Sequence, residues 1–233
     1  MTASKKSRKK TSHTSKKPSK SDFSHNVFIN CPFDSHYYPL FHAMVFAIHL
    51  LGFRPRCSRE EQNSKRVRVG KLMAIMCECK FGIHDISRTG LDSKNHLPRF
   101  NMPFELGIDI GISEVGNAAC RSKNLLILDK EPYRFQKFLS DIGGQDIAAH
   151  GNKVNHIVTV VRDWLQTATA ATDMPSGAVV FKFYQEFRKN LPEICAASNL
   201  EMSEMNFLDY SHAAADWVTK NYKKPRRPRV KNK

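Results

Sequence analysis

The stretch "PRFNMPFELGIDIG", residues 98–111, places one acidic side chain, Glu105, in the opening turn of an otherwise apolar, glycine-spaced helix. With Pro103 at the first helical position, Glu105 is the third residue, where a carboxylate meets the positive end of the helix dipole. We therefore expect Glu105 to stay ionised near neutral pH, with Gly107 and Gly111 leaving room for a close approach of sheet or ligand. The structural alternative is that Glu105 only caps the helix.

An ionised carboxylate that faces a ribose is suited to cleaving an N-glycosidic bond. The sugar becomes cationic at the transition state, so a fixed negative charge stabilises it or attacks it to form a glycosyl-enzyme. One carboxylate is sufficient when the leaving group is already a good one, as the pyridinium of NAD is. Glu105 is therefore the candidate catalytic residue.

Further polar residues follow the expected strands, at the edge where ligands bind in an open parallel sheet. The candidate substrate-binding residues are Asn30, Cys31, Phe33, Asp34, Arg56, Asp85, Ser87, Arg88, Arg99, Asn101 and Asp141. We expect Phe33 to stack on a base, and Asp85 and Ser87 to orient hydroxyl groups. Arg56, Arg88 or Arg99 would hold phosphate, because a guanidinium binds it in bidentate fashion.

Each cluster of polar residues also has a purely structural interpretation. Asp34 is suited to cap the following helix, and Asp85 to hold the turn after its strand. Arg88 or Arg99 would then pair with a neighbouring acid, and His84 would be a hydrogen-bonded core histidine. The stretch "SDIGGQD", which contains Asp141, would be only a turn.

Alternating strand and helix patterns predict how these residues are positioned. Apolar runs predict strands at 26–30, 53–58, 81–87 and 124–129, and Pro55 places the second near an edge. Apolar spacing of three and four predicts helices at 37–51, 64–80, from near 102, and at 153–166, with a short helical segment at 133–139. The alternation predicts an α/β, flavodoxin-like parallel sheet with helices on both faces. With strand order 2-1-3-4-5, Glu105 and the loops after strands one and three would share one pocket.

The chain divides into a central domain and appendages. Residues 26–166 form the expected α/β domain, 167–177 a linker of small residues, and 178–221 a small helical appendix. The ends, 1–25 and 222–233, each carry +7 of the net charge of +15, which leaves the body almost neutral. Their composition predicts disordered basic tails that either aid solubility or make weak, salt-sensitive contacts with nucleic acid or an anionic surface.

The cysteine spacing and the length of the apolar runs argue against a metal-binding, membrane or secreted protein. The six cysteines lack zinc-type spacing, so we expect reduced structural thiols and no metal site. The longest apolar run, residues 40–53, is too short for a membrane span, and no secretory segment follows the basic start. These features predict a cytoplasmic protein.

The motifs "FINCPFD", "GIHDISR", "PRFNMPFELG" and "SDIGGQD", taken in order, resemble the bacterial TIR-like and nucleoside 2-deoxyribosyltransferase-like superfamily, and more narrowly a family of TIR-like proteins. The resemblance covers residues 26–166. It implies a flavodoxin-like fold, an active-site glutamate at the position of Glu105, and NAD as substrate rather than cofactor. It also implies self-association into a homo-oligomer and a role in bacterial antiviral defence.

The leading hypothesis is therefore an enzyme that cleaves the N-glycosidic bond of a nucleotide, as an NAD glycohydrolase that releases nicotinamide. The alternatives are a non-catalytic module that binds a nucleotide signal in the same crevice, and a nucleoside 2-deoxyribosyltransferase-like enzyme. A third class, a nucleic-acid-binding protein, predicts an affinity that falls steeply with salt and depends on the tails.

Overall fold

The structure is a computed structural model that describes residues 20–61, 63–91 and 96–223. Its five strands form one parallel sheet in the order β2-β1-β3-β4-β5. The strands are β1 (Asn26–Asn30), β2 (Arg54–Cys57), β3 (Phe81–Asp85), β4 (Asn124–Asp129) and β5 (Ile147–Ala149). This is the flavodoxin-like order, and it confirms the predicted α/β class. Pro55 lies in the edge strand β2, as expected.

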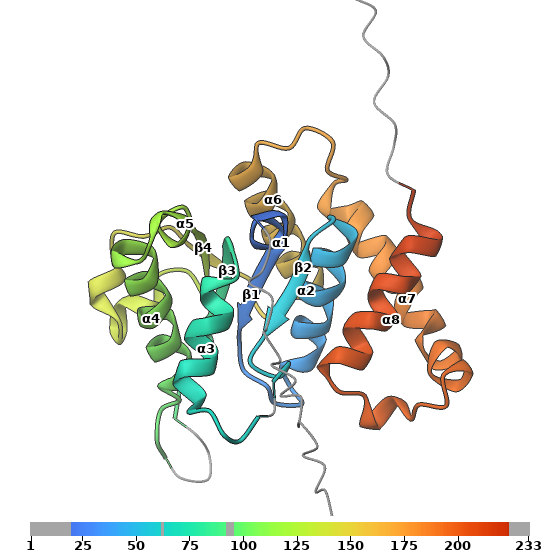
Figure 1. Ribbon diagram of the computed structural model, residues 1–233, viewed down its shortest axis with the longest axis horizontal. Helices are drawn as coiled ribbons and strands as arrows, with labels where there is room; N and C mark the ends of the chain where they lie inside the picture. Colours follow the sequence, from blue (N-terminus) through green and yellow to red (C-terminus); the bar gives the residue numbers. More distant parts are fainter. Residues whose placement is uncertain (1–19, 62, 92–95, 224–233) are drawn as a thin grey trace, which may run out of the picture.

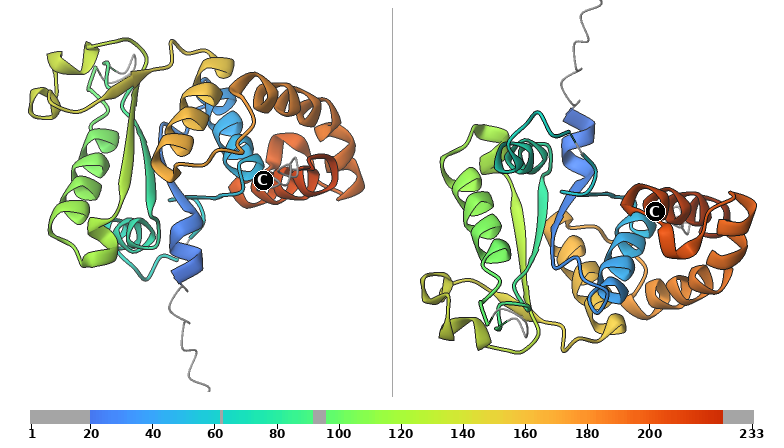
Figure 2. Two further views of the ribbon diagram at one scale, coloured as in Figure 1. Left: turned by 90° about the horizontal axis from the view of Figure 1, so that it is seen from above. Right: turned by 90° about the horizontal axis from the view of Figure 1, so that it is seen from below.

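Helices cover both faces of the sheet (Figure 1). They are α1 (Lys20–His25), α2 (Tyr38–Leu50), α3 (Arg68–Cys77), α4 (Asn101–Val115), α5 (Ala118–Arg121), α6 (Val154–Thr169), α7 (Gly177–Ala197) and α8 (Phe207–Asn221). The short 3-10 helices are η1 (Arg134–Lys137), η2 (Ser140–Ile142) and η3 (Met202–Glu204). Figure 2 shows α3 and α4 on one face and α2 and α6 on the other, with α7 and α8 beyond α2.

The pleat of the central strands sends alternate residues to the two faces. Val27 and Ile29 of β1 belong to the core under α2 and α6, whereas Phe28 packs against Leu72 and Met76 of α3. All five residues of β1 and of β3 are buried. Continuous apolar runs are what a strand covered on both faces requires, which is why these strands could be predicted from the sequence.

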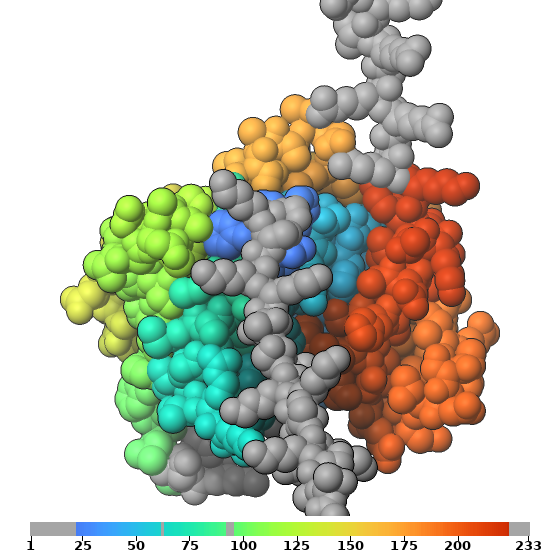
Figure 3. Space-filling view, in the orientation of Figure 1, coloured from blue at the N-terminus to red at the C-terminus, as the bar shows by residue number. Residues whose placement is uncertain are grey.

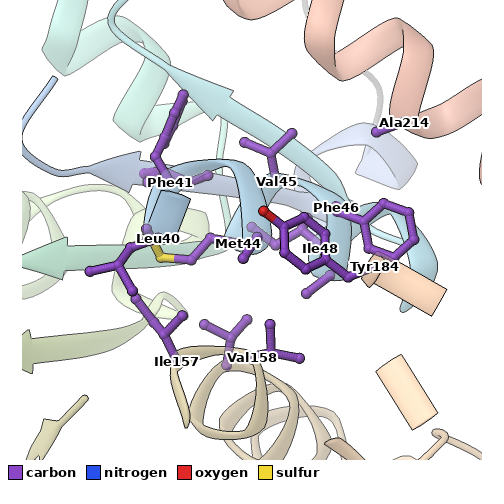
Figure 4. Close-up of a cluster of buried hydrophobic side chains, with 14 of the residues drawn as sticks. Leu40, Phe41, Met44, Val45, Phe46, Ile48, Ile157, Val158, Tyr184 and Ala214 are labelled. Atoms are coloured by element: carbon purple, nitrogen blue, oxygen red, sulfur yellow. The ribbon is translucent and has the colours of Figure 1, made fainter. Parts of the chain in front are cut away.

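Helix α2 is apolar almost all round because it is buried on nearly every side. Its side chains Met44, Ile48 and Phe46 contribute to one core together with Val158 of α6 and Tyr184 of α7 (Figure 4). The helix ends where Gly52 adopts a φ of +88°, as the sequence predicted. The sheet, α2 and the C-terminal helices are thereby held in one core.

The predicted appendix, 178–221, is the helix pair α7 and α8, which flanks α2 on the molecular surface (Figure 3). Ser176 caps α7 by accepting a hydrogen bond from the N–H of Val179, and Asn206 with Asp209 forms a capping box on α8. The pair is therefore defined by local signals at both helix starts.

The prediction that residues 1–25 form a disordered tail is wrong for residues 20–25, because these form helix α1. The carbonyl of Phe23 accepts a hydrogen bond of 3.0 Å from the N–H of Lys80, so α1 is tied to the start of β3. The rest of the two predicted basic tails, 1–19 and 224–233, lies outside the described residues. Among the helices that the structure describes, none has the length and apolarity needed to cross a membrane.

Candidate active site at the carboxyl ends of the strands

Helix α4 begins at Asn101, two residues earlier than the sequence indicated, so Glu105 is its fifth residue and not its third. Pro103 is tolerated at the third position because the first four backbone N–H groups of a helix have no partner within the helix. Glu105 therefore lies in the second turn, beyond the reach of a capping box. The structural alternative of a capping role for Glu105 is excluded by this register.

The Glu105 side chain is buried, with 6% of the residue exposed. Its Oε1 lies 3.7 Å from the guanidinium of Arg68, whose side chain is 68% exposed at the start of α3. Burial raises the pKa of Glu105 above its ordinary value of 4.5, while Arg68 acts in the opposite direction. Desolvation is the larger of the two effects, and the expectation that Glu105 is ionised near neutral pH stays a prediction.

Two cavities lie at the carboxyl ends of the strands. The first, here called the Phe33 cavity, has a volume of about 570 Å³, and the second, the Ser87 cavity, about 400 Å³. Arg99 lines both. The Phe33 cavity is lined by Pro32, Phe33, Arg59, Arg68, Leu97, Pro98, Arg99, Phe100, Asn101 and Met102. Met102 and Glu105 are three residues apart on α4, so Glu105 is adjacent to the wall of this cavity.

The Ser87 cavity is rich in cationic side chains. It is lined by Asp34, His36, Ser87, Arg88, Gly90, Leu91, Arg99, Lys130, Arg134 and Asn152. Asp34 pairs with Arg99 at 2.8 Å, and Arg134 with Asp129 at 2.6 Å. The hydroxyl oxygen of Ser87 is buried without a hydrogen-bond partner among the described residues. An unsatisfied hydroxyl beside several cations is suited to an anionic ligand.

Phe33 is half-buried, and its ring is partly occupied. The guanidinium of Arg59 lies 4.6 Å from the ring centroid, and Phe41 meets the ring in a T-shaped contact at 5.2 Å. A base would therefore have to share the ring with Arg59 or displace it. The stacking role predicted for Phe33 remains a prediction.

Asp85 is fully buried, and its carboxylate accepts hydrogen bonds from two protein donors. The N–H of Ser87 donates to Oδ1 at 2.8 Å, the hydroxyl of Tyr37 donates to Oδ2, and Nε2 of His150 lies 3.0 Å from Oδ2. Nδ1 of His150 accepts a hydrogen bond of 3.0 Å from the N–H of Asn152, whereas its Nε2 makes no hydrogen bond with the described residues. Asp85 thus joins β3 to the segments before α2 and α6, as a structural anchor.

A second buried polar cluster lies on the α4 face of the sheet. The Asn30 amide donates to the carbonyl of Met102 at 3.0 Å and lies 3.1 Å from Nδ1 of His84. Nε2 of His84 lies 3.0 Å from Asp109, which also pairs with the fully buried ammonium of Lys123 at 3.3 Å. The interpretation of His84 as a hydrogen-bonded core residue is confirmed. This cluster fixes the start of α4, and hence Glu105, against β1.

The predicted site residues divide into those that line the two cavities, those that are buried, and two that lie elsewhere. Those that line the two cavities are Phe33, Asp34, Ser87, Arg88, Arg99 and Asn101. Those that are buried and line neither cavity are Asn30, Cys31, Asp85 and Glu105. For Cys31, complete burial raises the thiol pKa well above its usual range, so it remains a neutral thiol.

Arg56 and Asp141 are not brought to the site. Arg56 is held by Glu60 at 2.6 Å and by Glu78 at 3.1 Å, so its guanidinium is engaged within the protein. Asp141 is exposed on η2 and lines neither cavity. The phosphate-binding role expected of Arg56 therefore conflicts with its observed ion pairs.

Sequence reasoning missed Arg68, Lys130 and Arg134 at the cavities. Lys130 and Arg134 follow directly after β4, so the rule that singled out Asp85 and Ser87 after β3 would also have found them. Arg68 is the first residue of α3, far from Glu105 in sequence, and nothing in its local sequence relates it to Glu105. The cluster partners Asp109 and Lys123 were missed for the same reason.

No family model, curated protein or solved structure matches this chain. The likeness to TIR-like proteins therefore rests on the four sequence motifs. Within the described residues, no group of three or more His, Cys, Asp or Glu side chains is arranged to hold a metal ion.

Proposed function

We propose that the crevice at the carboxyl ends of β1 and β3 cleaves the N-glycosidic bond of a nucleotide, with NAD as the substrate. The observation that carries this proposal is the position of Glu105. Glu105 is a buried acid whose ion-pair partner is an exposed arginine. It lies one helical turn from Met102, and Met102 lines the Phe33 cavity. The cationic Ser87 cavity adjoins the Phe33 cavity through Arg99.

Access to Glu105 requires that Arg68 turn away. The Arg68 side chain is largely exposed, so its guanidinium can turn into solvent. Because Arg68 lines the Phe33 cavity, a polar group of a nucleotide bound there would draw its guanidinium away from Glu105. Binding of the nucleotide would then free the Glu105 carboxylate to face the ribose.

The cationic cavity supplies the second requirement, which is a place for the phosphates. Arg88 is exposed and makes no ion pair with any residue that the structure describes, and Lys130 and Arg134 line the same cavity. The buried hydroxyl of Ser87 is free to donate to a phosphate or ribose oxygen. A dinucleotide would extend from the Phe33 cavity, where the glycosidic bond lies near Glu105, into the Ser87 cavity.

The reaction needs one carboxylate. Nicotinamide leaves with the electron pair of the C–N bond, and the ionised Glu105 stabilises the cationic ribose or bonds to it. Water then supplies the hydroxyl group that ends on the anomeric carbon, and one proton is released. The products are nicotinamide and ADP-ribose.

The test is to incubate the purified protein with NAD and to measure nicotinamide release by chromatography. We expect turnover by the parent chain and a loss of about 100-fold or more in Glu105→Gln, because the anion that stabilises the transition state is removed. Glu114→Gln, an exposed acid on the same helix, is the matched control and should retain activity. The assay is repeated over a range of protein concentrations, because the TIR-like resemblance implies self-association. Equal turnover by parent and Glu105→Gln would refute the proposal.

A second candidate is a non-catalytic module that binds a nucleotide signal. The observation in its favour is that Glu105 is nearly inaccessible and already paired with Arg68. Calorimetric binding of NAD without product, by the parent and by Glu105→Gln alike, would support the module. Parallel incubation with deoxynucleosides and free bases tests the transferase alternative. A metabolite profile of cells expressing the parent or Glu105→Gln tests which nucleotide is the substrate.

A further inference from the structure

A third cavity lies away from the strand ends, between α2, α7, η3 and α8. Its volume is about 370 Å³, within the range of about 300–1,000 Å³ that is usual for small-molecule sites. The wall combines aromatic side chains with two arginines, Arg59 and Arg188, and contains no acidic residue. We call it the α2–α8 cavity.

Three of its rings form a nearly parallel stack. The rings of Tyr38 and His42 lie 5.6 Å apart at 8°, and those of His42 and Tyr210 lie 4.0 Å apart at 14°. Burial, and then the charge of Arg188, lowers the pKa of His42 to about 4, so the imidazole is neutral at neutral pH. The stack therefore presents uncharged aromatic surface to the cavity, which favours a flat aromatic ligand.

The two arginines supply positive charge that the protein does not neutralise. Arg188 is exposed and has no carboxylate partner among the residues that the structure describes. Arg59 donates a hydrogen bond of 3.3 Å to the carbonyl of Phe33, and it too lacks an acidic partner within the described ranges. Two guanidinium groups without acids suit a doubly charged phosphate better than a single carboxylate.

We propose that the α2–α8 cavity binds a nucleoside monophosphate, with the base against the Tyr38, His42 and Tyr210 rings and the phosphate between Arg59 and Arg188. The Lys- and Arg-rich ends of this chain are unsuited to the cavity because their charge has the same sign as that of its arginines. The proposal does not depend on the chemistry of Glu105.

Arg59 connects this cavity with the candidate active site. It also lines the Phe33 cavity, where its guanidinium covers the Phe33 ring. A phosphate that draws Arg59 toward the α2–α8 cavity would uncover that ring. Such a movement would link binding in the α2–α8 cavity to the Phe33 loop.

The test measures binding of AMP, GMP, CMP and UMP by titration calorimetry. Each is compared with its nucleoside and with inorganic phosphate. All binding measurements, including those on the variants below, are made in the Glu105→Gln background. No ligand is then turned over, and failure of the proposed enzyme activity does not affect the result. We expect at least one monophosphate to bind about tenfold or more tighter than its nucleoside, because the charged group adds guanidinium hydrogen bonds.

Variants locate the site. Arg188→Gln should weaken monophosphate binding about tenfold and leave nucleoside binding unchanged. Lys189→Gln, the neighbouring cation outside the cavity wall, is the matched control and should bind like the parent. The proposal is overturned if no monophosphate binds more tightly than its nucleoside. It is also overturned if Arg188→Gln has no effect while Arg88→Gln, in the Ser87 cavity, abolishes binding.

Discussion

At the level of single residues, Glu105 is subject to opposing influences on its ionisation. Desolvation raises its pKa and the nearby Arg68 lowers it, with desolvation the larger effect. A carboxyl group with a raised pKa in the folded state binds its proton more tightly there than in the unfolded chain. Its protonated form therefore stabilises the fold below pH 4.5, and that contribution is lost as the pH rises through the folded-state value.

Glu105→Gln should consequently be as stable as the parent below pH 4.5 and more stable at neutral pH, since glutamine carries no charge to desolvate. Urea denaturation at an acidic and a neutral pH measures the difference. Glu114→Gln, on the exposed face of α4, is expected to show no such pH dependence. A glutamine variant that is less stable than the parent at neutral pH would contradict the direction of the shift.

Arg68 offers a kinetic test of the same residue pair. If the active form of Glu105 is the carboxylate, nicotinamide release falls on the acid side as Glu105 becomes protonated. Removing the cation in Arg68→Gln should raise the pKa of Glu105 further, so the acid limb of the pH–rate profile moves to higher pH. Arg66→Gln, an exposed arginine just before α3, should leave the limb in place. If the acid limb stayed in place in Arg68→Gln, the group that titrates there would not be Glu105.

At the level of elements, the contact between β3 and α4 depends on a glycine. A Cβ atom added at Gly82 would lie 2.7 Å from Cδ2 of Leu125 and 2.8 Å from Oδ2 of Asp109. The position is therefore filled by the Asp109 and His84 side chains, which belong to the cluster that fixes the start of α4. Helix α4 lies close to the sheet at this point because residue 82 has no side chain.

Gly82→Ala should therefore destabilise the protein by about 1–3 kcal/mol through overpacking. Gly70→Ala is the matched control, because a Cβ there meets nothing within 4 Å and alanine at this exposed position favours helix formation by up to about 1 kcal/mol. Chemical denaturation of both variants gives the two free energies of unfolding. Equal effects in the two variants would show that the contact is looser than described.

The ion pair beneath α4 makes a second prediction for this contact. Lys123→Met leaves the buried Asp109 carboxylate without its cation and removes the donor to the carbonyls of Met76 and Cys79. A loss of about 3–5 kcal/mol is expected in the free energy of unfolding. The double variant Lys123→Met with Asp109→Leu should be less destabilised than Lys123→Met alone, since no buried charge remains unpaired. A more severe loss in the double variant would argue against this account.

At the level of the whole molecule, α7 and α8 complete the core around α2. The Phe46 ring lies 5.1 Å from that of Phe187 and 5.8 Å from that of Trp217, which in turn contact each other. These residues belong to the same core as Val27 and Ile29 of β1. The C-terminal helices are therefore continuous with the α/β core, although the sequence suggested a separate appendix.

Phe187→Ala should accordingly cost about 3–5 kcal/mol and keep a single unfolding transition. Calorimetry together with tryptophan fluorescence checks both points, because Trp164 and Trp217 report on α6 and α8. Phe104→Ala, at an exposed position on α4, is the control and should cost far less. Two separate transitions would indicate that the C-terminal helices unfold independently of the sheet.

Local patterns in the chain were sufficient for strands β1, β3 and β4 and for helices α2, α4 and α6, because burial on both faces or on one stripe imposes a periodicity that a short window reveals. The same patterns placed Asp85, Ser87 and Glu105 at one edge of the sheet. The fifth strand of the predicted order had no predicted residue range, since the three half-buried residues of β5 are too few to show a period.

Packing alone settled what those residues meet. The pairing of Glu105 with Arg68, the burial of Asp85 under Tyr37 and His150, and the pairing of Arg56 with Glu78 each join segments distant in sequence. Ionisation and access depend on such neighbours, and no local spacing encodes them. The fold class could therefore be predicted from the sequence, whereas the pKa and the accessibility of the Glu105 carboxyl group depend on the tertiary contacts around it.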